Sequence, residues 1–225
     1  MLYELSIPIS PDIVRYDEAT PRPNFTPFTR IQSGDINNQT VISLFTHGGS
    51  HVDAPYHFCE SGETIDRVKV EDFIFRKALL VDVRSSKGGR IQIGQLKQRS
   101  GIENADLLML YMGYSQYLNN EQVYRDDFPA LTLEAARYLR EELPNLKAIA
   151  LDTLSVDGTD GFATGFANHH VLLDEREDGL RPLLIYECMN FIPILGHKGY
   201  CTVYGIPLRL VGLDASPVTM IAEFD

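Results

Sequence analysis

The segment HGGSHVDAPYH, residues 47–57, gathers three imidazoles and one carboxylate within eleven residues. The two glycines and the proline between them are poor residues for a helix interior, so extended chain is the expected conformation. In extended chain, alternate side chains share one face. All four side chains occupy odd-numbered positions: His47, His51, Asp53 and His57. The spacing therefore predicts that they point toward one place.

A divalent cation is the partner that this set of groups favours. Burying a carboxylate among imidazoles is costly unless something binds them together. Imidazole nitrogen and carboxylate oxygen suit Zn²⁺, Mn²⁺ or Fe²⁺, and the glycines allow the backbone to bend around an ion. The alternative is a histidine-rich loop without metal. Cys59 follows closely, but its even number places it on the other face, so we expect it to pack rather than to bind.

Composition limits the classes of protein that the chain can represent. Its 225 residues suit one domain, 1–225, with a sizeable core. The net charge of −11 argues against nucleic-acid binding and against a basic membrane patch. No apolar run approaches the roughly 20 residues that span a bilayer, and we find no signal-peptide pattern. Three widely spaced cysteines predict reduced thiols in a cytoplasmic protein.

The expected elements form a single mixed α/β domain, with a sheet or open β-barrel core flanked by helices. Residues 1–40 are rich in turn formers and predict an ordered N-terminal arm. A helix capped by Thr132 is the clearest element, and Pro207 and Pro217 suggest sheet edges or bulges. The predicted helices are 93–101 and 131–145, and the predicted strands are 40–45, 77–83, 105–114, 147–152, 181–187, 201–212 and 216–224.

The histidine segment resembles the HxGTHxDxPxH signature of the cyclase family, which includes bacterial kynurenine formamidases (arylformamidases) and isatin hydrolases. Ser50 stands in place of the usual threonine and keeps the hydroxyl. Further stretches resemble the family in the same order: IALDTLSVDG, NHHVLL, IYECMNF and YGIPLRLVGLDASPV. The resemblance implies a cyclase-like swivelling β/α fold and a homo-oligomer, most simply a dimer.

The resemblance also implies roles for particular residues. The implied ligands of one or two Zn or Mn ions are His47, His51, Asp53, His169 and Glu187. His57 matches the histidine that the family uses as general acid and base.

His170 is the alternative to His169, because adjacent residues of a strand face opposite ways; the HxxLL spacing favours His169. The stretch DEREDGLRP, residues 174–182, is expected to be a surface hairpin insertion before Glu187. Asp152, Ser155 and Asp157 are expected to support the site or form a turn. The sequence contains no G-x-S-x-G motif, which argues against a serine hydrolase.

The predicted activity is that of a metal-dependent amidohydrolase, arylformamidase-like or isatin hydrolase-like. Metal-activated water would cleave a C–N bond in a small-molecule amide, either an N-formyl arylamine or a cyclic amide. A cyclase or dehydratase of polyketide-like metabolism and a non-catalytic metal-binding module are the alternatives. His57 argues against the module, because metal binding alone does not need it. The arm contains NFTPF, and we expect Phe25 or Phe28 to pack near a partner's active site.

Overall fold

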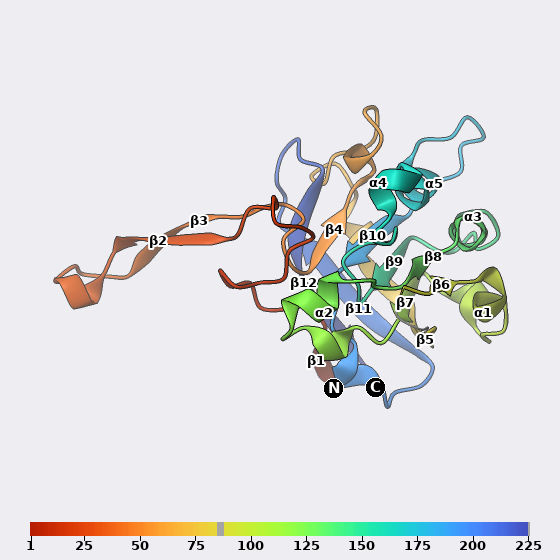
Figure 1. Ribbon diagram of the computed structural model, residues 1–225, viewed down its shortest axis with the longest axis horizontal. Coiled ribbons are helices and arrows are strands. Elements are labelled where there is room, and N and C mark those ends of the chain that lie inside the picture. Colours follow the sequence, from red (N-terminus) through yellow and green to blue (C-terminus); the bar gives the residue numbers. More distant parts are fainter. Residues whose placement is uncertain (85–87, 225) are drawn as a thin grey trace.

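A closed, barrel-like sheet forms the centre of the molecule (Figure 1). The computed structural model describes residues 1–84 and 88–224. Seven strands close the ring in the order β12, β11, β5, β7, β9, β10, β4, with β4 returning to β12, and β1 pairs outside β12. These strands are β1 (Leu2–Glu4), β4 (His51–Asp53), β5 (Ile74–Asp82), β7 (Leu107–Tyr111), β9 (Ala148–Leu151), β10 (Leu184–Glu187), β11 (Tyr200–Pro207) and β12 (Ala215–Glu223). The predicted α/β class with a barrel core is confirmed.

Three strands in the parallel part of the ring, β7, β9 and β10, are buried on both faces. β5, β7, β9 and β10 pair in parallel, and every residue of β7 is buried. Leu107 and Met109 pack with strand residues from the rest of the sheet, whereas Leu108 and Leu110 pack against helices. This alternation explains the continuous apolar run LLMLY, because a strand covered on both faces needs apolar residues at every position.

In the part of the chain that the structure describes, five short α-helices accompany the sheet: α1 (Ile93–Lys97), α2 (Glu121–Arg125), α3 (Leu133–Glu141), α4 (Gly161–Thr164) and α5 (Ala167–Leu173). The predicted cap of α3 is confirmed, since the Thr132 hydroxyl accepts a hydrogen bond of 3.2 Å from the Ala135 amide. Two short strands, β6 (Arg90–Ile91) and β8 (Ala130–Leu131), pair with each other. Six 3₁₀ turns complete the described elements: η1 (Ile31–Ser33), η2 (Pro55–His57), η3 (Val70–Phe73), η4 (Ile102–Asn104), η5 (Ser115–Tyr117) and η6 (Ile192–Ile194).

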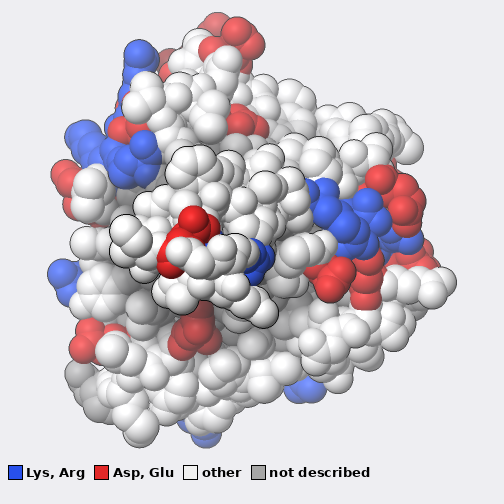
Figure 2. Space-filling view, turned by 90° about the vertical axis from the view of Figure 1, so that its left-hand side faces the viewer, with Lys and Arg blue, Asp and Glu red and all other residues white. Residues whose placement is uncertain are grey.

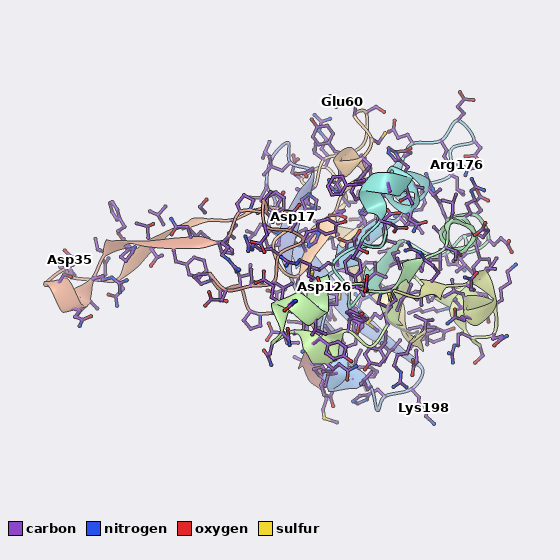
Figure 3. All side chains as sticks on the ribbon, viewed as in Figure 1. Asp17, Asp35, Glu60, Asp126, Arg176 and Lys198 are labelled. Carbon is purple, nitrogen blue, oxygen red and sulfur yellow. The ribbon has the colours of Figure 1, made fainter. Side chains whose placement is uncertain are left out.

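The N-terminal arm contains a two-stranded ribbon that leaves the body of the molecule (Figure 1). It is formed by β2 (Asn24–Thr29) and β3 (Gln39–Ser43), and Asp35 marks its far tip in Figure 3. The strand predicted over 40–45 is therefore only partly right. β3 ends at Ser43 and pairs with β2 alone, so it does not enter the barrel.

Two further expectations are corrected by the structure, and several short helices were missed. Pro217 lies inside β12, at the residue where this strand stops pairing with β11 and pairs with β4. Residues 174–182 form a loop without strand pairing, so the predicted hairpin is wrong. Three helices, α2, α4 and α5, were not predicted, because each has at most seven residues and little apolar periodicity. Within 1–84 and 88–224, no helix has the length and apolarity that a membrane span requires.

Candidate metal centre and active site

The strand β4 brings together residues from three parts of the chain. Its three residues lie between β10 and β12, and His51 pairs with Glu187 on one side and with Pro217 on the other. Asp53 lies two residues along the same strand, so its side chain shares the face of His51. Closure of the barrel therefore places both side chains beside the carboxylate of Glu187.

The flanking histidines reach the same place through turns rather than through extended chain. His47 precedes β4 in a turn, and His57 ends the 3₁₀ turn η2, which begins at Pro55. Gly49 has φ +71°, and a Cβ atom there would come within 2.2 Å of the Ile13 side chain. Only glycine adopts this conformation readily in so little space. The expected extended conformation is thus confirmed for β4 alone, although the four side chains do converge.

His169 reaches the cluster from the helix α5, not from a strand. Asp157 stabilises the N-terminus of this helix, because its carboxylate accepts hydrogen bonds from the backbone amides of Asn168 and His169. Its Oδ2 also lies 2.6 Å from His169 Nδ1. His170 is exposed and contacts Asp174. The assumption of a strand here was wrong, but the structure places His169, and not His170, in the cluster.

The far end of α5 is fixed by a buried guanidinium. Arg140 of α3 is 2 % exposed and donates hydrogen bonds to four backbone carbonyls at the end of α5 and in the following loop, those of Val171, Asp174, Leu180 and Arg181. The loop, marked by Arg176 in Figure 3, is thereby tied to the helix that carries His169. The inserted stretch lengthens the chain between His169 and Glu187 without separating the two side chains.

Asp53 lies at the middle of the converging groups. Its Oδ1 is 2.9 Å from His47 Nδ1 and 3.3 Å from His51 Nε2, and its Oδ2 is 3.7 Å from His169 Nε2. Glu187 lies 3.6 Å from both His51 Nε2 and His169 Nε2. Among the described residues, donor atoms within 4.8 Å of one another form two sets of three, His47–Asp53–His57 and His51–Asp53–Glu187. Asp53 belongs to both sets.

Unpartnered buried atoms show that these residues fit a cation. Asp53 is fully buried, yet neither carboxylate oxygen accepts an aligned hydrogen bond, and His51 Nε2 also lacks a partner. Buried polar atoms are rarely left in this state, because each costs on the order of 1–3 kcal/mol. His51 Nδ1 faces the Gly49 carbonyl, which leaves Nε2 directed to the carboxylates. A divalent ion would satisfy all three atoms.

The charges of the cluster alter its proton affinities strongly. Burial alone would lower the pKa of His47, but Asp53 and Asp214 raise it to about 10. Burial would likewise raise the pKa of Asp53, yet three neighbouring imidazoles hold it well below its ordinary value. A proton on His47 thus helps to balance the buried carboxylates, and a cation is the natural replacement for it.

Asp214 is a site residue that the sequence analysis missed. It immediately precedes β12, and its Oδ2 lies 2.7 Å from His47 Nε2 and 3.4 Å from His57 Nδ1. Hydrogen bonds from these two imidazoles hold the pKa of Asp214 well below its ordinary value. Asp214 lies in the stretch LDASPV, which resembles the family, and this resemblance was the available sequence signal. Only the pairing of β12 with β4 shows that its carboxylate lies beside the histidines.

A cavity of about 260 Å³ opens onto the cluster and has an aromatic wall. His57 lines it and is 25 % exposed, in contrast to the buried His51 and His169. Phe58 stacks on the His169 ring with 4.5 Å between centroids. The remaining aromatic residues of the wall are Tyr16, Phe45, Phe162 and Phe166. The cavity therefore presents polar groups on one side and flat apolar rings on the other.

The chain is similar to known proteins over nearly its whole length. The kynurenine formamidase of Bacillus cytotoxicus is 27 % identical over 218 residues, which cover 97 % of this chain and 95 % of the relative. Cyclase-like protein 3 of Arabidopsis thaliana is 26 % identical, over 98 % of this chain and 78 % of that protein. Isatin hydrolase A from Labrenzia aggregata, bound to benzyl benzoate, has the same fold, with a TM-score of 0.81 at 18 % identity over 99 % and 93 % of the two chains. A family model described as putative cyclase matches residues 3–158, and the chain therefore belongs to the cyclase family.

Proposed function

We propose that this protein is a divalent-metal-dependent hydrolase that cleaves the C–N bond of a small aryl amide, either an N-formyl arylamine or a cyclic amide. One observation carries the proposal: the unpartnered buried atoms of Asp53 and His51 lie beside His57, which lines an open aromatic cavity. The names of the relatives, formamidase and isatin hydrolase, support this choice of bond.

Five residues of the cluster would bind the metal, and another residue would support one of them. His47, His51, Asp53, His169 and Glu187 would hold one or two ions, Zn²⁺ or Mn²⁺. A bound ion would supply Lewis-acid activation of water and of the amide carbonyl. Asp157 faces His169 Nδ1 and so fixes the tautomer that presents Nε2 to the carboxylates.

His57 would move the proton that the reaction requires. It would take a proton from the attacking water and return it to the leaving nitrogen, and Asp214 would hold its ring through Nδ1. The aromatic wall favours a substrate with a flat ring, because ring faces pack well against Phe58 and its neighbours.

Metal analysis combined with turnover tests the proposed function. The protein purified with Zn²⁺ or Mn²⁺ should hold one or two ions per chain and should hydrolyse members of a panel of N-formyl arylamines and cyclic aryl amides. Chelation should abolish turnover, and the added metal should restore it. Well under one ion per chain after incubation would contradict the metal centre. Full loading without turnover of any amide on the panel would contradict the reaction.

We further propose that the protein is a homodimer in which the ribbon β2–β3 packs on the partner. A two-stranded ribbon is marginally stable alone, and this one exposes apolar side chains to solvent. They are Phe25, Phe28, Ile31, Ile36, Val41 and Ile42. Figure 2 looks onto the side of the molecule from which the ribbon projects: groups of charged side chains lie toward its edges, and much of the surface between them is uncharged. A two-fold dimer is the commonest soluble assembly.

Replacing ribbon residues 27–40 with a short Asn-Gly turn should convert the dimer to a monomer and lower turnover while the metal stays bound. This change leaves the buried Leu5 and Ile13 in place, so the body should still fold. Sedimentation at micromolar concentration measures the mass of both proteins. The control is Val70→Ser, which removes an apolar side chain at a 51 % exposed position outside the ribbon and should leave the dimer intact. A full-length protein that sediments as a monomer would refute the dimer.

A further inference from the structure

The pairing between β4 and β10 ends at two of the proposed metal ligands. These strands lie side by side and run antiparallel, and their last paired position joins His51 to Glu187 (Figure 1). Beyond this pair the two backbones turn to other partners. The carbonyl of Ser50 accepts a hydrogen bond from an amide of β12, whereas the amide of Cys188 donates one to the carbonyl of Thr153. Backbone pairing therefore no longer joins the two strands at this point.

The hydroxyl of Ser50 joins the strands where their backbone pairing stops. It donates a hydrogen bond of 2.6 Å to the carbonyl of Cys188, the residue that follows Glu187. It also accepts a hydrogen bond of 2.8 Å from the amide of Ile7, in the N-terminal segment. Ser50 is 1 % exposed, so water does not compete for either bond. One hydroxyl thus connects three segments of the chain beside the ligands His51 and Glu187.

Cys188 has a backbone conformation that depends on such a constraint. Its φ is +57°, in the left-handed region that residues other than glycine seldom adopt. This conformation persists only where the surrounding structure enforces it, and the bond from Ser50 is one of the enforcing contacts. Glu187 directly precedes Cys188, and its Oε1 accepts a hydrogen bond of 2.8 Å from the Val156 amide. Relaxation of Cys188 would therefore shift the backbone that carries the Glu187 carboxylate.

We propose that Ser50 is a positioning residue of the metal centre: its hydroxyl sets the separation of His51 and Glu187, and thereby the affinity for a cation. This inference rests on the proposed metal-dependent function. Nε2 of His51 lies 3.6 Å from the Glu187 carboxylate, and with Asp53 the two residues form one of the donor sets. Metal–ligand distances are narrowly fixed, so a small displacement of one ligand from another weakens binding.

The affinity for Zn²⁺ tests this role independently of turnover. In the full chain stripped of metal, Ser50→Ala should weaken binding of a Zn²⁺ ion by about 10- to 100-fold, as for other groups that support a metal ligand. Ser50→Thr keeps the hydroxyl and should stay within about threefold of the wild type. Competition with a chromophoric chelator measures the dissociation constants. The visible spectrum of the Co²⁺-loaded protein should change in Ser50→Ala and match the wild type in Ser50→Thr.

Ser6→Ala is the matched control. Ser6 is also buried, and its hydroxyl accepts a backbone hydrogen bond of 3.1 Å, from the amide of Met220. Its loss should destabilise the metal-free protein much as Ser50→Ala does, yet change the Zn²⁺ affinity by less than about twofold. Wild-type affinity in Ser50→Ala would overturn the inference. Equal losses of affinity in Ser50→Ala and Ser50→Thr, or in Ser50→Ala and Ser6→Ala, would overturn it too.

A second variant decides the question if Ser50→Ala does not fold. Ser50→Cys fills the same place, but a thiol donates and accepts only weak hydrogen bonds. It should weaken Zn²⁺ binding by at least about threefold, and wild-type affinity would overturn the inference. Wild-type protein that binds no Zn²⁺ would refute the proposed metal centre, and the role of Ser50 with it. Zn²⁺ binding without turnover of any amide would refute the proposed reaction alone.

Discussion

His57→Ala should lower kcat by on the order of 10²–10⁴ while the protein keeps its metal. His57 is the most accessible of the converging imidazoles, and it lines the cavity that a substrate would fill. Its Nδ1 is 3.4 Å from Asp214, an arrangement that suits a ring exchanging protons through the other nitrogen. Removing the ring leaves space at the open end of the site, so added imidazole should restore part of the lost rate.

The metal content of the same variant separates two roles for His57. His57, His47 and Asp53 offer donor atoms within 4.8 Å of one another, which is also an arrangement suited to a cation. Elemental analysis of His57→Ala should find the wild-type number of ions. Loss of an ion would make His57 a ligand and refute its role as acid and base. His170→Ala, on the exposed side of α5, is the matched control and should retain both metal and rate.

The main features of the barrel could be predicted from local sequence. Strands such as β7 and β9 are short apolar runs, and the helix α3 carries its own cap at Thr132. The ribbon could not be placed in this way. Residues 40–45 have the composition of a core strand, but composition does not reveal the pairing partner, and β3 pairs only with β2.

The candidate site was predictable where its residues are close in sequence. The segment from His47 to His57 carries its own spacing, and the structure brings its four polar side chains together with His169 and Glu187. Asp214 was missed although it lies in the stretch LDASPV, because no spacing along the chain ties it to the histidines. Asp214 meets the histidines only because β12 pairs with β4.

Asp53→Asn should weaken metal binding by at least about 100-fold and abolish turnover. Loss of a group that merely supports a ligand already costs 10- to 100-fold in affinity, and Asp53 contacts three imidazoles directly. The amide has nearly the same volume, so the fully buried position stays filled. It carries no charge, however, and presents one oxygen instead of two. Neither of the two donor sets that share Asp53 would then be complete.

Thermal unfolding distinguishes this loss from simple damage to the fold. An ion that binds only the folded protein stabilises it by about 2.7 kcal/mol at a hundred times its Kd, so the wild-type Tm should rise with added Zn²⁺ or Mn²⁺. The Tm of Asp53→Asn should not respond to the same additions. Asp174→Asn, an exposed carboxylate at the end of α5, makes the same chemical change outside the cluster and should respond as the wild type does. If Asp53→Asn keeps both its ions and the metal-dependent rise in Tm, the cation is held elsewhere, and the unpartnered atoms of the cluster need another explanation.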